Sequence, residues 1–88
     1  MLRIDFSNVF KKSYKKLNKK DKELFAAISL KLANNEILEP KYKDHALKGK
    51  FIGFRECHLK PDLLLIYQKQ EDKLVLYCLN IGSHSELF

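Results

Sequence analysis

The chain contains few cysteines, and they follow no pattern that would join them into a framework. Only Cys57 and Cys78 occur, far apart in two strand-like runs, and no CxxC pair is present. Small secreted domains are usually held together by several disulfides, whereas isolated apolar cysteines are typical of reduced cytosolic proteins. We therefore expect two buried, unpaired thiols.

The chain also lacks long apolar segments and metal-ligand spacings. Residues 1–12 have no apolar core of a signal peptide, and no apolar run approaches the roughly 18 residues of a membrane span. The spacings HxxxH and CxxC are both missing, so we expect no zinc site and no cofactor. These absences predict a bacterial-type cytoplasmic protein that does not contact a membrane.

Acidic residues are in the minority. The 17 Lys and Arg outnumber the 11 Asp and Glu, which gives a net charge of +6 over 88 residues. Such an excess favours a polyanionic partner, nucleic acid above all, or an acidic protein. Lysines dominate residues 11–20, where they form either a solvated helix face or a phosphate-binding face. The length fits a single domain over residues 1–88.

The N-terminal part of the sequence predicts a strand followed by two helices. Residues 2–6 alternate apolar and polar side chains, which is typical of a short edge strand. Ser7 can cap the first helix, and Asn18 or Asp21 can cap a second one that ends near Ala33. The apolar stripe of the first helix recurs at spacings of four and three, at Phe10, Tyr14 and Leu17. The short link between the helices favours an antiparallel helical hairpin.

The remainder of the sequence predicts a loop and three antiparallel strands. Residues 37–50 show no periodicity and are predicted to be a loop, which in so small a domain is often functional. Strands are expected at residues 51–59, 62–69 and 74–79. The middle strand is so apolar that we expect it to be buried on both faces. The predicted class is α+β: an N-terminal strand, a two-helix hairpin and an antiparallel β-meander.

Ionisable side chains gather around the first hairpin. Its first strand and its turn carry an acid, an imidazole, an ammonium group and a second acid, at Glu56, His58, Lys60 and Asp62. His45 lies in the predicted loop and His84 just past the last strand, so all three histidines are expected outside the helices. A meander can bring its strand ends together at one rim, so we hypothesise that the imidazoles share a pocket. Each histidine alone also fits a purely structural role.

Four ordered segments of the sequence match a known family. They are residues 44–49 (DHALKG), 55–58 (RECH), 60–67 (KPDLLLIY) and 82–88 (GSHSELF). This series resembles the YafQ branch of the RelE/ParE superfamily, the toxins of type II toxin–antitoxin systems. The order of strand, two helices and meander also agrees with a RelE-like fold. The resemblance implies a ribosome-dependent endoribonuclease, an mRNA interferase, that a small antitoxin holds inactive.

The resemblance also implies a metal-free reaction in which the 2′-hydroxyl attacks the adjacent phosphate and leaves a cyclic phosphate on the upstream fragment. That reaction needs a base, an acid and positive charge beside the phosphate. His84 matches the C-terminal histidine of the family and is the candidate acid. His58, Glu56 or Asp62 is the candidate base, and His45 is expected to orient the substrate or share in proton transfer. Substrate-binding candidates are Lys48, Arg55 and Lys60 for the phosphate and Phe88 for stacking on a base.

Two positions depart from the pattern of the family. Leu63 stands where relatives often carry Trp, which removes a stacking surface. Asn80 stands where they often carry Arg, which removes a cation and leaves phosphate binding to Arg55 and the lysines. Two alternatives stay open: a non-catalytic RNA- or ribosome-binding module, and a ParE-like gyrase inhibitor. The histidines speak against the second, because inhibiting gyrase needs no acid–base pair.

The expected partners follow from the charge and from the resemblance. A cationic toxin should pair with an acidic, partly disordered antitoxin, expected to be of the ribbon-helix-helix type. This antitoxin is expected to cover the lysine-rich helix, the sheet edge or both. The ribosome and mRNA are the other expected partners, and the toxin–antitoxin complex is expected to bind its own operator DNA.

Overall fold

A five-stranded sheet with the strand order β1-β5-β4-β3-β2 forms the centre of the fold. The computed structural model describes residues 1–88. The strands are β1 (Arg3–Phe6), β2 (His45–Ala46), β3 (Arg55–Lys60), β4 (Leu63–Gln70) and β5 (Val75–Gly82). β1 runs parallel to β5, and the other neighbouring strands are antiparallel. The predicted α+β class and the antiparallel meander are therefore confirmed.

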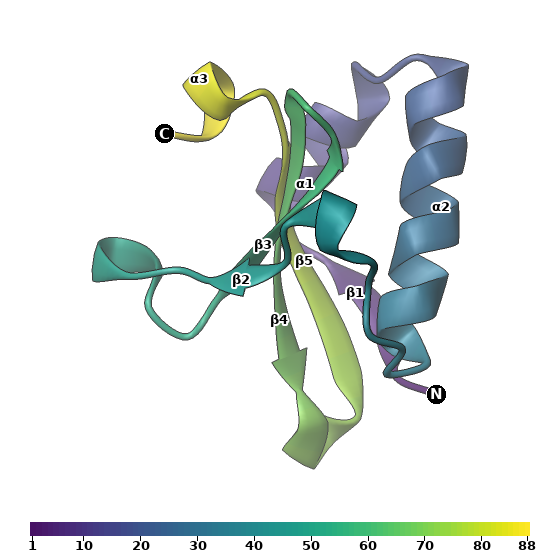
Figure 1. Cartoon of the computed structure of the whole chain (residues 1–88), viewed down its shortest axis with the longest axis vertical. Helices are drawn as coiled ribbons and strands as arrows, with labels where there is room; N and C mark the ends of the chain where they lie inside the picture. Colours follow the sequence, from purple (N-terminus) through teal and green to yellow (C-terminus); the bar gives the residue numbers. More distant parts are fainter.

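Helical elements lie on both faces of this sheet. They are α1 (Asn8–Lys15), α2 (Lys19–Ala33) and the short α3 (His84–Leu87). α1 and α2 cover one face, while α3 and the loop between β2 and β3 lie on the other (Figure 1). No helix of the chain is both long and apolar enough to cross a membrane.

Side-chain caps fix where the first two helices begin. Ser7 Oγ accepts a hydrogen bond from the backbone N–H of Phe10 at 2.9 Å, and Asn18 Oδ1 accepts one from that of Asp21 at 2.8 Å. A cap of this kind contributes about 1 kcal/mol. Both predicted helix starts are confirmed, with Asn18 rather than Asp21 as the second cap.

Strand β4 is buried on both faces, as its apolar run predicts. Leu65 and Tyr67 are fully buried on the side of α1 and α2. Leu64 and Ile66 are equally inaccessible on the other side, where they belong to one cluster with Leu87 of α3. Burying a side chain of this size contributes about 1.5–3 kcal/mol. Both layers of the protein therefore depend on this one strand.

The two cysteines are buried and unpaired, as predicted. Cys57 lies in β3 and Cys78 in β5, both with no exposed surface. Burial raises the pKa of Cys78 to about 12, and it raises the pKa of Cys57 as well. Because the thiolate is the reactive form, neither side chain is suited to nucleophilic chemistry.

The prediction of a plain loop over residues 37–50 is wrong in part. The segment contains β2 and the 3-10 turn η1 (Pro40–Tyr42), and a second such turn, η2 (Gly49–Phe51), follows. A two-residue strand is too short to show an alternating pattern and is defined only by its pairing with β3. β3 begins at Arg55 rather than near residue 51, because η2 and Gly53, with φ of 92°, first turn the chain.

Two other boundaries differ from those predicted. α1 ends at Lys15, so Leu17 of the predicted stripe lies in the link between the helices, where it packs against the core. β5 continues to Gly82, past the predicted end at Leu79, because a register shift lets its pairing with β4 continue. The longer β5 brings the C-terminal segment to the same end of the sheet as the β3–β4 turn.

A third helix stands where the sequence analysis predicts none. His84 is the first residue of α3, so the expectation that all three histidines lie outside helices is wrong. Ser83 accepts a hydrogen bond from the backbone N–H of Glu86, whose carboxylate accepts one from the Ser83 N–H, which makes a capping box. The Ser-x-x-Glu spacing in the sequence is the signal that would have revealed this helix.

Candidate active site

The register of β2, β3 and β4 places two histidines and an acid on one face of the sheet. His45 of β2 pairs with Glu56 of β3, and His58 lies two residues after Glu56 in β3. Residues two apart in a strand point to the same face, so Glu56 and His58 share the face of their β4 partners, Ile66 and Leu64. This is the face that carries α3 and is turned away from α1 and α2.

A buried carboxylate stands between the two imidazoles. Glu56 is only 5% exposed, and its Oε1 lies 3.4 Å from His58 Nε2 and 3.8 Å from His45 Nε2. Removing a carboxylate from water is costly unless polar groups compensate for the loss. His58 is the nearer of the two polar groups beside it, and the three side chains lie in one polar cluster. All three are candidates from the sequence.

A backbone contact fixes the orientation of the His45 ring. His45 Nδ1 lies 2.7 Å from the carbonyl oxygen of Lys43. A carbonyl oxygen only accepts, so Nδ1 carries the proton and Nε2 faces Glu56. Lys43 is in the left-handed conformation, with φ of 48°, which turns its carbonyl towards the ring.

The segment that carries His45 is anchored from the opposite face of the sheet. Asp44 Oδ1 accepts a hydrogen bond from the Tyr67 hydroxyl at 2.5 Å and one from Arg55 Nε at 3.2 Å. Burial, and then the bond to Asp44, raises the pKa of Tyr67. Tyr67 and then Asp44 raise the pKa of Arg55. Arg55 is therefore held by Asp44 and is not brought to the histidines.

His84, the first residue of α3, follows β5 at the end of the sheet that carries His58. His58, Leu64 and Gly82 form a row across β3, β4 and β5. Two strand spacings separate the ends of this row, roughly 10 Å. His84 follows Gly82 by two residues, and α3 packs through Leu87 on the face that carries His58. His84 thus follows the end of the sheet that carries His58, although its ring makes no hydrogen bond with His45 or His58.

Asp62 and Phe88 hold this C-terminal segment in place. Asp62 Oδ1 accepts a hydrogen bond from the backbone N–H of His84 at 3.1 Å. The rings of Phe88 and His84 are 5.2 Å apart, and Phe88 also meets Phe51 edge-on at 5.6 Å. Asp62, a predicted base, is therefore placed to position His84.

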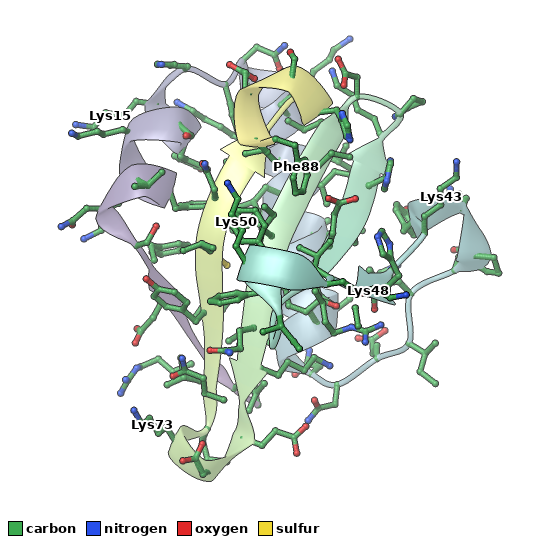
Figure 2. The ribbon with its side chains drawn as sticks, turned by 90° about the vertical axis from the view of Figure 1, so that its left-hand side faces the viewer. Lys15, Lys43, Lys48, Lys50, Lys73 and Phe88 are labelled. Atoms are coloured by element: carbon green, nitrogen blue, oxygen red, sulfur yellow. The ribbon has the colours of Figure 1, made fainter.

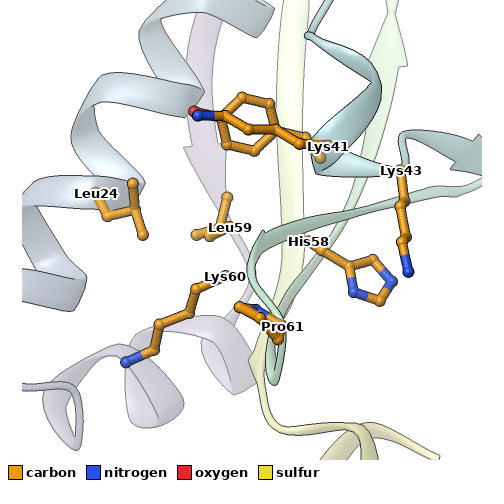
Figure 3. Close-up of a pocket in the computed structure, with 8 residues that line it drawn as sticks. Leu24, Lys41, Lys43, His58, Leu59, Lys60 and Pro61 are labelled. Carbon is orange, nitrogen blue, oxygen red and sulfur yellow. The ribbon is translucent and has the colours of Figure 1, made fainter.

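Some of the lysines near the site lie on its face, and one points away from it. Figure 2 shows Lys43, Lys48 and Lys50 on the face that also carries Phe88. Of these, Lys48 was predicted, while Lys43 and Lys50 were not, although they flank the DHALKG segment that carries Lys48. Lys60 is different: its Nζ lies 2.9 Å from Asp21 Oδ1 and points towards α2, away from His58 (Figure 3). The structure does not bring Lys60 to the histidines.

Comparison with known proteins shows the class of protein to which this arrangement belongs. A family model described as "Bacterial toxin of type II toxin-antitoxin system, YafQ" matches residues 2–88. The chain belongs to this family of toxins, which confirms the resemblance seen in the sequence.

Named relatives and solved structures agree with that assignment. The chain is 36% identical over 88 residues to the mRNA interferase toxin YafQ of Escherichia coli strain K12, covering 97% of this chain and 94% of the relative. It is also similar to a metal-bound toxin from Helicobacter pylori, with 50% identity, a TM-score of 0.92 and full coverage of both chains. The E. coli DinJ–YafQ complex gives 34% identity and a TM-score of 0.86, over 100% of this chain and 99% of that one.

The metal in the H. pylori structure raises the question of whether this chain offers a metal site. No group of three or more His, Cys, Asp or Glu side chains is arranged to hold an ion. His45, Glu56 and His58 have suitable donor atoms, with Glu56 Oε1 3.4 Å from one Nε2 and 3.8 Å from the other, but they are not among such groups. The residues as placed therefore do not form a metal site.

Proposed function

We propose that this protein is the mRNA interferase toxin of a type II toxin–antitoxin system. The observation that carries the proposal is the buried Glu56 carboxylate between His45 and His58, on a face lined with lysines. Imidazoles can exchange protons near neutral pH, and lysines attract the phosphates of RNA. Membership of the YafQ family supports the same activity.

The proposed reaction is a transfer of the phosphate within the RNA chain. His58 takes the proton of the 2′-hydroxyl, and the 2′-oxygen forms a bond to the adjacent phosphorus. The bond to the 5′-oxygen breaks, and His84 donates a proton to that leaving group. The products are a 2′,3′-cyclic phosphate and a 5′-hydroxyl, so no other reactant is consumed.

Each neighbouring residue has a distinct part in this scheme. Glu56 faces Nε2 of His58, which leaves Nδ1 free for the substrate and stabilises the ring once it has taken a proton. His45 lies on the other side of Glu56, where it contributes a second imidazole to the phosphate. Asp62 positions His84 through the backbone.

The cationic face supplies the binding energy for RNA. Lys43, Lys48 and Lys50 lie around the histidines, and Phe88 offers a half-exposed ring for stacking on a base. We propose that the protein acts in the cytoplasm, where ribosomes present mRNA as a single strand. The side chains of Leu63 and Asn80 add no stacking ring and no cation to this face.

The test is cleavage of mRNA on programmed ribosomes. His58→Ala and His84→Ala should each slow cleavage by roughly 10²- to 10⁴-fold. Lys48→Ala should weaken binding, whereas Lys73→Ala is the matched control, because Lys73 lies in η3 (Glu71–Lys73) at the far end of the sheet (Figure 2). EDTA should not stop the reaction.

Other outcomes would identify the alternatives. A binding module would occupy the ribosome and leave the mRNA intact, and a gyrase inhibitor would leave ribosomes alone and damage DNA. Cleavage that survives in both histidine variants, or that EDTA abolishes, would contradict the proposed chemistry.

We also propose that an acidic antitoxin covers the outer surface of α1 and α2. A groove of about 580 Å³ there has an aromatic floor of Phe6, Phe10, Tyr14 and Phe25 and a rim of Lys11, Lys15 and Lys22. None of these three lysines forms an ion pair within the chain. Phe6 is 40% exposed and Tyr14 partly exposed, and aromatic surface of this kind beside unpaired cations suits an amphipathic acidic segment. The E. coli DinJ–YafQ toxin–antitoxin complex is a precedent for a related toxin bound to an antitoxin.

Acetylation of the purified complex tests this surface. Lys11 and Lys15 should be protected in the complex, while Lys73 should react as it does in the free toxin. Unchanged reactivity of Lys11 and Lys15 would mean that the antitoxin binds elsewhere. We expect the antitoxin, of ribbon-helix-helix type, to supply recognition of operator DNA.

A further inference from the structure

A second groove, of about 520 Å³, adjoins the candidate active site. It is lined by Leu24, Lys41, Tyr42, Lys43, His58, Leu59, Lys60 and Pro61 (Figure 3). His58 lines this groove and also contacts Glu56, so one imidazole connects the two sites. Neither His45 nor His84 lines the groove.

The groove exists because the edge of β3 is only partly covered. β2 pairs with β3 opposite Arg55 and Glu56 alone, so no strand covers the edge from His58 to Lys60. The turn η1 lies beside that edge instead, and its Tyr42 lines the groove together with Lys60 and Pro61 at the β3–β4 turn. The left-handed conformation of Lys43 then returns the chain to β2.

The lining has the chemistry of a nucleotide site. Leu24, Leu59 and Pro61 form an apolar surface, and the half-buried ring of Tyr42 packs beside it. Neither Lys41 nor Lys43 is paired with a carboxylate. The Nζ of Lys41 lies 5.2 Å from the centre of the Tyr42 ring. Aromatic and apolar surface accepts the face of a base, and unpaired lysines at its rim accept a phosphate.

Lys60 makes a different contribution to the same groove. Its ammonium group is neutralised by Asp21 of α2, whose side chain is only 13% exposed, so Lys60 is directed towards α2 (Figure 3). The uncompensated charge is therefore concentrated at Lys41 and Lys43, and Lys43 lies beside His58 (Figure 3). A phosphate held by Lys43 would thus lie next to the imidazole assigned as the base.

We propose that this groove binds the single-stranded RNA nucleotide adjacent to the scissile phosphate. Its base packs on Tyr42, and its phosphate is held by Lys43. This inference rests on the proposed ribonuclease function and adds to it a subsite that sets affinity at one flanking position. The groove offers apolar contact and stacking rather than a set of hydrogen-bonding groups, so it discriminates among bases chiefly by stacking strength.

The first test compares variants in the ribosome assay. Tyr42→Leu keeps a side chain that packs on the core but removes the ring, and Lys43→Asn removes the charge while tolerating the left-handed backbone. Each should raise KM roughly tenfold and leave kcat within about twofold, because a stacked base and a phosphate contact act mainly on binding. Tyr42→Phe should behave like the wild type. Tyr77→Leu, on β5 away from the groove, is the matched control.

A second test measures binding without cleavage. The probe is a short RNA with 2-aminopurine at the flanking position and a 2′-O-methyl group at the scissile nucleotide. Stacking on Tyr42 should quench its fluorescence, and Tyr42→Leu should abolish the quenching.

The two tests separate the subsite from the activity. Unchanged KM and unchanged quenching in folded Tyr42→Leu would overturn the subsite, while cleavage by the wild type would leave the proposed function intact. If the wild type cut no mRNA but quenched the probe through Tyr42, the subsite would stand and the proposed function would fail.

Discussion

Tyr67→Phe tests whether the far face of the sheet holds the candidate active site in place. The substitution removes only the hydroxyl, which donates to Asp44 Oδ1 at 2.5 Å. Hydrogen bonds to charged groups contribute about 1.5–3 kcal/mol. Asp44 keeps its bond to Arg55 and is partly exposed, so water can replace part of the loss. We therefore expect the lower end, about 1.5 kcal/mol.

The assay has one readout for stability and one for function. For a chain of this length, a loss of 1.5 kcal/mol lowers Tm by about 6–12 °C. Cleavage on ribosomes at a temperature where the variant is folded should also fall, because Asp44, then held by Arg55 alone, fixes the neighbouring His45 beside Glu56 less firmly. Tyr77→Phe is the control, since Tyr77 is half-buried and its hydroxyl makes no hydrogen bond within the chain.

Two results would refute the reasoning. If both Tyr→Phe variants lost less than about 0.5 kcal/mol, the bond to Asp44 would contribute nothing measurable. If Tyr67→Phe lost stability but cleaved at the wild-type rate when folded, Asp44 would anchor the loop without positioning His45.

Three further predictions concern stability and reactivity. Leu74→Gly should raise the free energy of unfolding, measured in urea titrations, by about 0.5 kcal/mol. Leu74 has a left-handed backbone, with φ of 54°, which glycine adopts more easily, and at 65% exposure its side chain contributes little packing. Leu74→Ala is the control and should give no such increase. Cys57 and Cys78 should resist Ellman's reagent at pH 8 until the protein unfolds, since both thiols are fully buried and burial raises the pKa of each. Hydrogen bonds from Ser83 lower the pKa of Glu86. The ionised carboxylate therefore stabilises α3 fully at pH values above the ordinary pKa of a glutamate, and this stabilisation is lost as the pH falls through the lowered pKa. The Ser83 amide should lose protection from hydrogen exchange in acid, and Glu86→Gln should remove this pH dependence.

The local pattern of the sequence predicts most of the fold. Ser7 and Asn18 mark both helix starts, and the continuous apolar run of β4 indicates burial on two faces. β2 could not be found this way, because two residues have no period and their pairing with β3 depends on distant parts of the chain. The capping residues around α3 were visible in the sequence, and that helix could have been predicted.

The candidate site was predicted in its composition more than in its geometry. Glu56 and His58 share a face because they are two apart, and the same alternation puts Arg55 on the other face, which could have been anticipated. The pairing of Lys60 with Asp21 could not, since it depends on how α2 lies against the β3–β4 turn. The bond between Tyr67 and Asp44 likewise joins segments that only the folded sheet brings together.

The parallel pairing of β1 with β5 has a consequence for how the protein folds. Arg3 is in register with Val75, so the first strand finds its place only after β5, about 70 residues later, is available. Contacts between such distant residues form late and slow the folding of a domain. The edge position of β1 is therefore filled late, and until then β5 presents an unpaired edge. An unpaired edge is open to pairing with the strand of another chain, so the late arrival of β1 exposes the folding protein to aggregation.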